Sequence, residues 1–197
     1  ILMLKAITVR REFFNEKYKM TFDFLYSLRY SKSQVIQYQI IDMIPFFGEY
    51  LKEEFEKKYF LKFSKFLLEC YNSSSAQIIK NSILVSLGKL SIFISISSFY
   101  DTAKEIVNII KPDFETNINS PIPLSEIDCL AELLVNYPEL ILNVVPFDIL
   151  LNKIFLSGFY ESHVKFLGEL LLVFDDNSTE EIQILLLVLN VISLILS

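Results

Sequence analysis

The sequence Phe166-Leu167-Gly168-Glu169-Leu170 lies within an apolar run from about Ser162 to Phe174. Its pattern is an apolar pair, a small residue, a charged residue and another apolar residue. Three further copies occur with small changes: Ser86-Leu87-Gly88-Lys89-Leu90, Cys129-Leu130-Ala131-Glu132-Leu133 and, most weakly, Phe46-Phe47-Gly48-Glu49-Tyr50. The small residues at 48, 88, 131 and 168 are separated by 40, 43 and 37 residues. A period near 40 residues in a helical sequence is typical of stacked helical repeats.

Three of the four glycines in the chain occupy this recurring position. Glycine inside a helix costs about 1 kcal/mol relative to alanine, so its recurrence indicates a packing requirement. A residue without a bulky side chain lets a neighbouring helix approach closely where the two helices cross. The alternative is that glycines fall by chance in apolar helices. We expect Gly48, Gly88, Ala131 and Gly168 to occupy equivalent places in successive units.

The composition predicts an all-α protein. Hydrophobic residues make up 52% of the 197 residues, Gly and Pro are scarce, and there is no Trp. This composition favours long helices over turn-rich sheets. The chain begins with Ile1 and ends within an apolar stretch, so we expect a segment of a longer protein. We expect one repeat array over 1–197, with units near 20–58, 59–98, 99–137 and 138–176 and partial repeats at both ends.

Several local signals place helix boundaries. Pro45 and Pro112 are expected to end helices, because proline lacks the backbone N–H and clashes with the preceding turn. A long loop is predicted from Pro112 to Pro123. Helices are expected to begin at Tyr137-Pro138-Glu139 and at Pro146-Phe147-Asp148. Four serine-initiated capping boxes are predicted at Ser31 with Gln34, Ser74 with Gln77, Ser125 with Asp128 and Ser178 with Glu181.

A short helix, a second helix and a long third helix, repeated near 40 residues, resemble the armadillo repeat. The resemblance is clearest from Tyr137 to Phe174, where Tyr137-Pro138-Glu139 is similar to the start of that repeat and Leu167-Gly168-Glu169-Leu170 to its third helix. Residues 60–93 match nearly as well, and HEAT repeats are the near neighbour. The resemblance implies a right-handed α-solenoid whose third helices line a concave surface.

Nuclear-import adaptors of the armadillo family read basic peptides with a Trp and an Asn four residues apart on the third helix. The matching pairs here are Val85 with Lys89, Asp128 with Glu132, and Lys165 with Glu169. Because the chain has no Trp, that mode of cargo reading is disfavoured, although a peptide groove of another kind is not.

The third-helix polar positions form the candidate partner-binding site. Its members are Lys89, Asp128, Glu132, Lys165 and Glu169. Glu132 and Glu169 occupy equivalent motif positions and would suit a basic peptide. The competing interpretation is a simple solvated face. Residues 1–80 carry 13 basic and 9 acidic side chains, whereas residues 81–197 carry 5 and 15, so a cationic partner would be drawn to the second part.

Catalysis, cofactors and metals have little support in the sequence. The single histidine, His163, begins a helix and is expected to be exposed or to cap that helix. Asp175-Asp176 followed by Glu180-Glu181 lacks the alternation and the glycine of a calcium loop. Phosphate-binding and nucleophile motifs are missing. We expect a non-enzymatic protein without a cofactor.

The remaining composition signals concern location and partner class. Cys70 and Cys129 follow no ligand spacing and are expected to be buried thiols in a reducing, cytoplasmic or nucleocytoplasmic compartment. The run Ile182–Leu196 is 15 residues long, shorter than the roughly 20 residues that span a bilayer. Five lysines between residues 52 and 65 alternate with glutamates, which indicates a mixed-charge helix rather than a nucleic-acid surface.

These observations favour a scaffold that binds a protein or peptide on the concave third-helix surface. A transport adaptor or receptor of the nuclear-import kind is the first alternative. A regulatory helical domain of a larger enzyme or trafficking factor is the second.

Overall fold

The computed structural model describes residues 20–115, 120–157, 161–174 and 178–196. Helix makes up 84% of the structure, and these ranges contain no strand, so the all-α prediction is confirmed. The chain divides into two compact units, Ile1–Ile94 and Ser95–Ser197. The Asp175-Asp176-Asn177 segment, expected to be a turn, lies outside the described residues.

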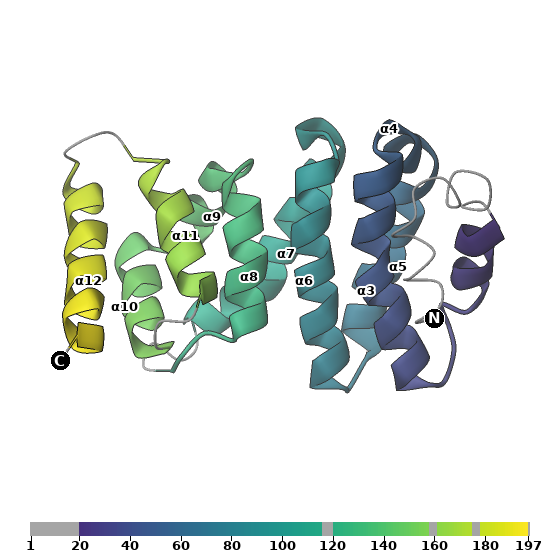
Figure 1. Cartoon of the computed structure of the whole chain (residues 1–197), viewed down its shortest axis with the longest axis horizontal. Helices are drawn as coiled ribbons and strands as arrows, with labels where there is room; N and C mark the ends of the chain where they lie inside the picture. Colours follow the sequence, from purple (N-terminus) through teal and green to yellow (C-terminus); the bar gives the residue numbers. More distant parts are fainter. Residues whose placement is uncertain (1–19, 116–119, 158–160, 175–177, 197) are drawn as a thin grey trace. The chain divides into compact units, whose positions relative to one another are not determined.

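The first unit is built from helices that alternate in direction (Figure 1). A first helix covers residues 20–27. The others are α3 (Gln34–Leu51), α4 (Glu53–Phe55), a π-helical turn (Glu56–Phe60), α5 (Leu61–Ser73) and α6 (Gln77–Phe93). Between α3 and α4, Lys52 has a φ of 46°, which lets the chain turn sharply there. Such a backbone conformation is uncommon for a residue other than glycine.

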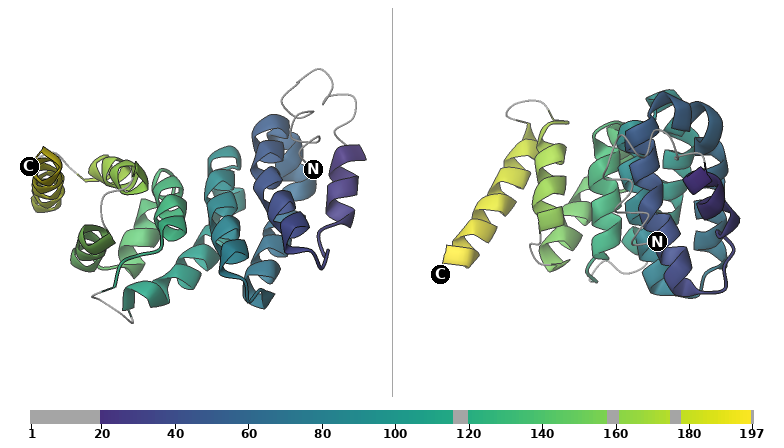
Figure 2. Two further views of the ribbon diagram at one scale, coloured as in Figure 1. Left: turned by 60° about the horizontal axis from the view of Figure 1, so that its bottom comes forward. Right: turned by 45° about the vertical axis from the view of Figure 1, so that its right-hand side comes forward.

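Helices α3 and α6 lie side by side and run in the same direction (Figures 1 and 2). A Cβ added to Gly48 of α3 would lie 2.9 Å from Cδ2 of Leu90 and 3.6 Å from Cβ of Phe93, both on α6. This close approach agrees with the packing role expected of the recurring small residue at Gly48. Gly88 is buried within α6, and Ala131 is buried within α8 of the second unit.

Pro45 does not end its helix, contrary to the prediction. Helix α3 continues through Pro45 to Leu51. Proline has no N–H to donate to the carbonyl oxygen of Ile41, four residues earlier. Oγ of Ser86, on α6, donates a hydrogen bond of 2.7 Å to that carbonyl oxygen. The neighbouring helix therefore supplies the donor that proline removes, which makes an internal proline tolerable here.

An aromatic cluster fills the core of the first unit beside α3 and α5. The ring of Phe22 lies 5.4 Å from that of Phe47, 4.0 Å from that of Tyr59 and 4.8 Å from that of Phe63, measured between centroids. Phe22, Phe47 and Phe63 are all buried. Their packing stabilises the contact of the helix at 20–27 with the rest of the unit, because burying large aromatic side chains removes much apolar surface from water.

The second unit contains six helices in its described ranges. They are α7 (Ile96–Glu115), α8 (Leu124–Leu134), α9 (Pro138–Val144), α10 (Phe147–Ser157), α11 (Glu161–Leu171) and α12 (Thr179–Leu196). The prediction that Pro112 ends a helix is wrong, because α7 continues to Glu115. Residues 112–115, which were expected in the loop at 112–123, therefore belong to α7. No helix in the described part of the chain has the length and apolar character to cross a bilayer.

Both predicted proline starts in the second unit are confirmed. Pro138 occupies the first turn of α9, and Tyr137 precedes it as the N-cap residue. The Tyr137 hydroxyl donates a hydrogen bond of 3.1 Å to the carbonyl oxygen of Ile96 at the start of α7. Phe147 is the first residue of α10, and the backbone N–H of Leu150 donates to the Pro146 carbonyl oxygen.

The first two capping boxes are wrong in detail. Oγ of Ser31 accepts a hydrogen bond from the backbone N–H of Ser33 at 3.2 Å, and Oγ of Ser74 accepts one from Ala76 at the same distance. Ser33 and Ala76 are the N-cap residues, and neither makes a side-chain capping bond. Both predicted serines therefore brace the turn before the helix, because a hydroxyl oxygen competes well for an N–H two residues on.

The third capping box is also wrong, and the fourth is only partly described. Ser125 lies inside α8 and is buried, since Pro123 is the N-cap residue of that helix. The extended backbone at Pro123 moves the helix start ahead of the serine. The N–H of Ile182 donates to the backbone carbonyl oxygen of Ser178, as expected for a helix start there. The side chain of Glu181 lies outside the described residues.

Gly168 departs from the expected equivalence of the four small residues. It is exposed on α11, and a Cβ placed there would meet nothing within 4 Å. Gly48, Gly88 and Ala131 are buried, so the four positions do not share one depth. The motif copies match in sequence, but no described helix crosses α11 at Gly168.

Candidate functional site

Four of the five predicted site residues lie on two helices of the second unit. Helix α8 carries Asp128 and Glu132, and α11 carries Lys165 and Glu169. Each pair is separated by four residues, so its members lie one helical turn apart on the same face. The two helices pack extensively against each other. The second unit therefore gathers these four side chains along one seam.

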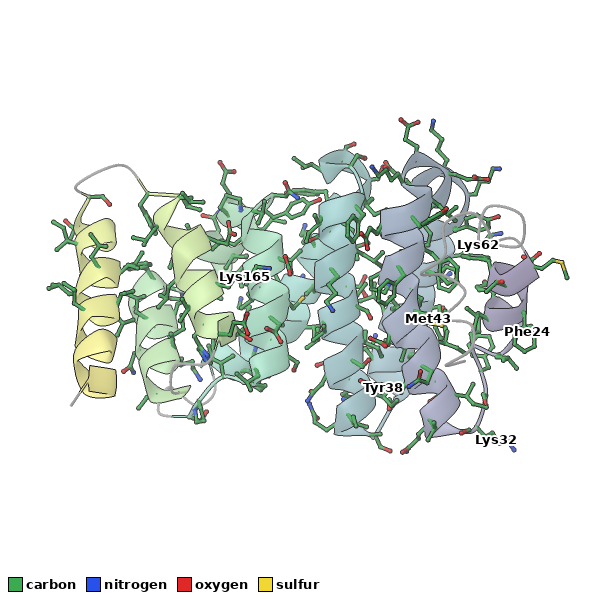
Figure 3. All side chains as sticks on the ribbon, viewed as in Figure 1. Phe24, Lys32, Tyr38, Met43, Lys62 and Lys165 are labelled. Atoms are coloured by element: carbon green, nitrogen blue, oxygen red, sulfur yellow. The ribbon has the colours of Figure 1, made fainter. Side chains whose placement is uncertain are left out.

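An ion pair crosses this seam. Nζ of Lys165 lies 2.5 Å from Oε1 of Glu132, and Figure 3 labels Lys165 on α11. The Lys165 side chain is 44% exposed and that of Glu132 is 16% exposed. Glu132 is therefore partly neutralised by a neighbour rather than fully open to a partner. Asp128 and Glu169 are half-buried and contribute the remaining negative charge.

His163 is completely buried on α11, so the expectation of an exposed or capping histidine is wrong. Burial lowers the pKa of His163 because it disfavours the charged imidazolium, while the nearby Asp128 carboxylate acts in the opposite direction. The influence of Asp128 on His163 also shows that the start of α11 lies beside this part of α8. Together with the Glu132–Lys165 pair, it indicates that the two helices run in the same direction.

Exposed apolar side chains flank the acidic seam. Leu124 and Val135 of the α8 region are 43% and 52% exposed, and Val164 and Leu172 of the α11 region are 61% and 81% exposed. Leu124, Asp128, Glu132 and Val135 follow helical spacing along one side of α8. The face therefore combines carboxylates with apolar contacts, which is the chemistry that suits a segment with both basic and apolar residues.

Lys89, the fifth predicted residue, belongs to the first unit and is exposed on α6. Ile78 and Ile92 flank it on the same helix and are 62% and 48% exposed. On the adjoining α3, Tyr38 and Phe46 are partly exposed, and Figure 3 labels Tyr38. The face around Lys89 is thus mostly apolar, unlike the acidic seam of the second unit.

The lysine-rich helix of the first unit pairs part of its own charge. Nζ of Lys57 lies 3.1 Å from a Glu53 carboxylate oxygen, and Nζ of Lys58 lies 2.8 Å from one of Glu54. These i,i+4 pairs agree with the interpretation of a mixed-charge helix.

Sequence reasoning missed a buried polar cluster in the second unit. Lys153 of α10 is completely buried, and Glu126 of α8 is 4% exposed. Nζ of Lys153 donates hydrogen bonds to the backbone carbonyl oxygens of Asp113, at 2.6 Å, and of Ser120, at 3.4 Å. It also lies 6.0 Å from the centroid of the Phe114 ring. A single ammonium group thus joins α10 to the end of α7 and to the segment before α8.

Glu126 is held in its neutral form by this environment. Burial raises the pKa of its carboxyl group to about 9, and a hydrogen bond and charge repulsion from Asp113 act in the same direction. The positive charge of Lys153 opposes the shift. The buried carboxyl group of Glu126 and the buried ammonium group of Lys153 therefore interact in this part of the second unit, and the exposed Asp113 also acts on Glu126.

The sequence did contain a signal that Lys153 is buried. Leu150, Lys153 and Ile154 all lie on the buried stripe of α10, at helical spacing. A lysine in the middle of an apolar stripe needs an internal acceptor, because an uncompensated buried charge is costly. The sequence alone could not name Asp113 and Ser120 as those acceptors, since they are 40 and 33 residues away.

Within the described ranges, no group of three or more His, Cys, Asp or Glu side chains is placed to hold a metal ion. Cys129 is buried, as expected, and Cys70 is only half-buried; neither forms a disulfide. Burial, with a smaller contribution from Glu69, raises the pKa of the Cys70 thiol to about 11. No protein-family model, curated protein or solved structure matches this chain.

Proposed function

We propose that this protein is a non-catalytic, armadillo-like scaffold that binds a basic protein or peptide segment along α8 and α11. The observation that carries the proposal is the shared seam of Asp128, Glu132, Lys165 and Glu169, flanked by exposed apolar side chains. Carboxylates arranged along a seam attract and orient a cationic chain. The flanking apolar groups supply contact area for its uncharged residues.

The packing of long helices supports the repeat assignment. In the first unit, Ile41 contacts Ser86 and the Gly48 position approaches Leu90, so α3 and α6 are parallel with an offset near one repeat. In the second unit, the pairing of Glu132 with Lys165 gives a similar parallel relation between α8 and α11. Two parallel pairs at such offsets are what stacked third helices of a solenoid would produce.

The Glu132–Lys165 pair suggests how binding would work. A basic side chain of the partner would compete with Lys165 for the Glu132 carboxylate and would meet Glu169 one turn from Lys165. Because Lys165 is 44% exposed, its ammonium group can turn toward water when it is displaced. Exposed ion pairs contribute only about 0.2–1 kcal/mol each, so the charges would govern selectivity more than affinity.

The test is a titration of a lysine- and leucine-rich peptide, labelled for fluorescence anisotropy, at two salt concentrations. Glu132→Gln and Glu169→Gln should each weaken binding about two- to fivefold. Lys165→Gln should strengthen it by a similar factor, because it removes a competing cation. The parent's affinity should fall as salt rises, since the Debye length is about 8 Å at physiological ionic strength.

Glu49→Gln provides the matched control, because Glu49 is an exposed carboxylate on α3 of the other unit. This variant changes the net charge by the same amount as Glu132→Gln or Glu169→Gln. Its affinity for the peptide should nevertheless equal that of the parent within experimental error. The proposal fails if all four variants bind alike, or if Lys165→Gln weakens binding. A peptide in which the lysines are replaced by glutamates should not bind.

A further inference from the structure

Helices α3 and α6 present their outward sides as one face of the first unit. They lie side by side, run in the same direction and stand in front of α5 in Figure 1. Oγ of Ser86 reaches the carbonyl oxygen of Ile41, 45 residues earlier, and the Gly48 position approaches Leu90. Residues of α3 therefore lie at nearly the same level as residues of α6 that follow them by a little over 40 positions.

Large apolar side chains are exposed on both helices of this face. They are Val35, Tyr38 and Phe46 on α3, and Ile78 and Ile92 on α6, and their exposed fractions lie between 36% and 71%. Single exposed apolar residues are ordinary on a protein surface. Two adjoining rows of them, broken by a few charges, are typical of a surface that another protein covers.

The charges on the two helices have opposite signs. Helix α3 contains two acidic residues, Asp42 and Glu49, and no basic residue, whereas α6 contains two basic residues, Lys80 and Lys89, and no acidic residue. Asp42 and Glu49 lie about one helical turn before and after Phe46. Glu49 and Lys89 are both exposed. The α3 side of the face is therefore complementary in charge to the α6 side.

The two rows also share their spacing. Three residues of α3 each have a counterpart exactly 43 positions later on α6, and these pairs are Val35 with Ile78, Phe46 with Lys89, and Glu49 with Ile92. This separation matches the level relation between the two helices. A twofold axis parallel to the helices would place α3 of one copy opposite α6 of another at the same level. Each row would then meet the row that matches its spacing and opposes its charge.

We propose that this face binds a second copy of the chain and forms a twofold symmetric dimer. Val35 of one copy packs against Ile78 of the other. Lys89 of one copy lies over the Phe46 ring of the other, where a cation and an aromatic face attract each other. The long Lys89 side chain also reaches the Glu49 carboxylate of the other copy. A second copy is the occupant that fits, because the face is complementary to itself in both spacing and charge.

The test is sedimentation velocity on the whole chain over a wide range of protein concentration. The mass should rise from that of one 23.0 kDa chain to that of two and then stay constant. Lys89→Glu and Glu49→Lys should each weaken dimerisation about tenfold or more, because each places like charges opposite each other twice in a symmetric dimer.

An equimolar mixture of these two variants is the decisive sample. In a mixed dimer, the introduced acid of one copy faces the introduced base of the other, while the unchanged Glu49 and Lys89 form the second pair. The mixture should therefore dimerise within about threefold of the parent's affinity, although neither variant does so alone.

A second pair of variants tests the apolar contact. Ile78→Asp should weaken dimerisation by a similar factor, because it places a carboxylate against Val35. Leu61→Asp is the matched control, since Leu61 is 77% exposed on α5 and lies outside the face. This control should dimerise like the parent. Thermal melts by circular dichroism should show that all of these surface variants remain folded.

Several outcomes would overturn the dimer. A parent that stays monomeric at every concentration excludes it, as does a mass that grows without limit at two chains. A dimer that survives Lys89→Glu, Glu49→Lys and Ile78→Asp must use another surface. Failure of the mixed variants to associate better than each one alone excludes the twofold arrangement.

Discussion

At the scale of single residues, Gly48 and Gly168 show how one motif position can have two different environments. A methyl group at Gly48 would press against Leu90, which is fully buried and has little room to move. A methyl group at Gly168 would meet nothing within 4 Å. The intrinsic preference of a helix for alanine acts at both positions, but steric crowding acts at only one of them.

Gly168→Ala is therefore expected to raise the free energy of unfolding by about 0.5–1 kcal/mol. Gly48→Ala should give a smaller gain or a loss, and Gly48→Leu should destabilise by about 1–3 kcal/mol because it overpacks the α3–α6 contact. Urea titrations monitored by circular dichroism would measure the differences. If Gly168→Leu lowers the free energy of unfolding as much as Gly48→Leu does, the conclusion that Gly168 has open surroundings is wrong.

At the scale of whole helices, α3 and α7 each continue through an internal proline and so extend beyond their predicted ends. Proline normally breaks a helix at a cost of about 3 kcal/mol. In α3, the hydrogen bond from Ser86 to the Ile41 carbonyl oxygen offsets part of that cost. Because Ser86 belongs to α6, helix continuity here depends on a residue 45 positions away in the sequence.

A double-mutant cycle tests this dependence. Ser86→Ala leaves the buried Ile41 carbonyl oxygen without its donor, and we expect a loss of about 1–3 kcal/mol in the free energy of unfolding. Pro45→Ala restores an N–H that can donate to the same oxygen, so Ser86→Ala should cost about 1 kcal/mol less in that background. The cycle cancels the packing change at residue 45. Strictly additive effects would show that the two residues do not share the Ile41 oxygen.

At the scale of the whole molecule, the charge asymmetry follows the division into two units. Residues 1–94 carry 14 basic and 9 acidic side chains, whereas residues 95–197 carry 4 and 15. The first unit is thus positive and the second strongly negative. A cationic partner would be steered to the second unit, which also contains the acidic seam of α8 and α11.

The pH dependence of stability is expected to reside in the second unit. The pKa of Glu126 is raised from 4.5 to about 9 in the folded protein, so the folded state holds a proton that the unfolded state has released. The contribution of Glu126 to the free energy of unfolding is fully present below about pH 4.5 and is lost as the pH rises toward about 9. The slope is at most about 1.4 kcal/mol per pH unit.

Glu126→Gln should remove this slope, because glutamine remains neutral at every pH. Its melting temperature should therefore exceed that of the parent at pH 8 and approach it at pH 4. Differential scanning calorimetry across this range is the measurement, with Glu105→Gln as the control for a simple change in net charge. A parent whose stability rises between pH 5 and pH 8 through Glu126 would contradict the assignment.

Much of the helical architecture could be predicted from the sequence because helix formation depends on local patterns. Apolar spacing, the scarcity of glycine and the Tyr137-Pro138 start all act within a few residues of each other. The motif positions of Asp128, Glu132, Lys165 and Glu169 were also predictable. Four-residue spacing on a helix places each pair on one face, whatever the rest of the fold does.

The remaining features were decided by tertiary contacts. Gly168 and Gly48 look alike in sequence, but only the helix packed beside Gly48 makes a small residue necessary there. Pro45 is tolerated because a distant serine supplies its missing hydrogen bond. Burial of Lys153 depends on carbonyl oxygens 33 and 40 residues away, which no local pattern can specify. Local sequence thus determined which residues form helices, while long-range packing and desolvation decided what each polar or small residue does within them.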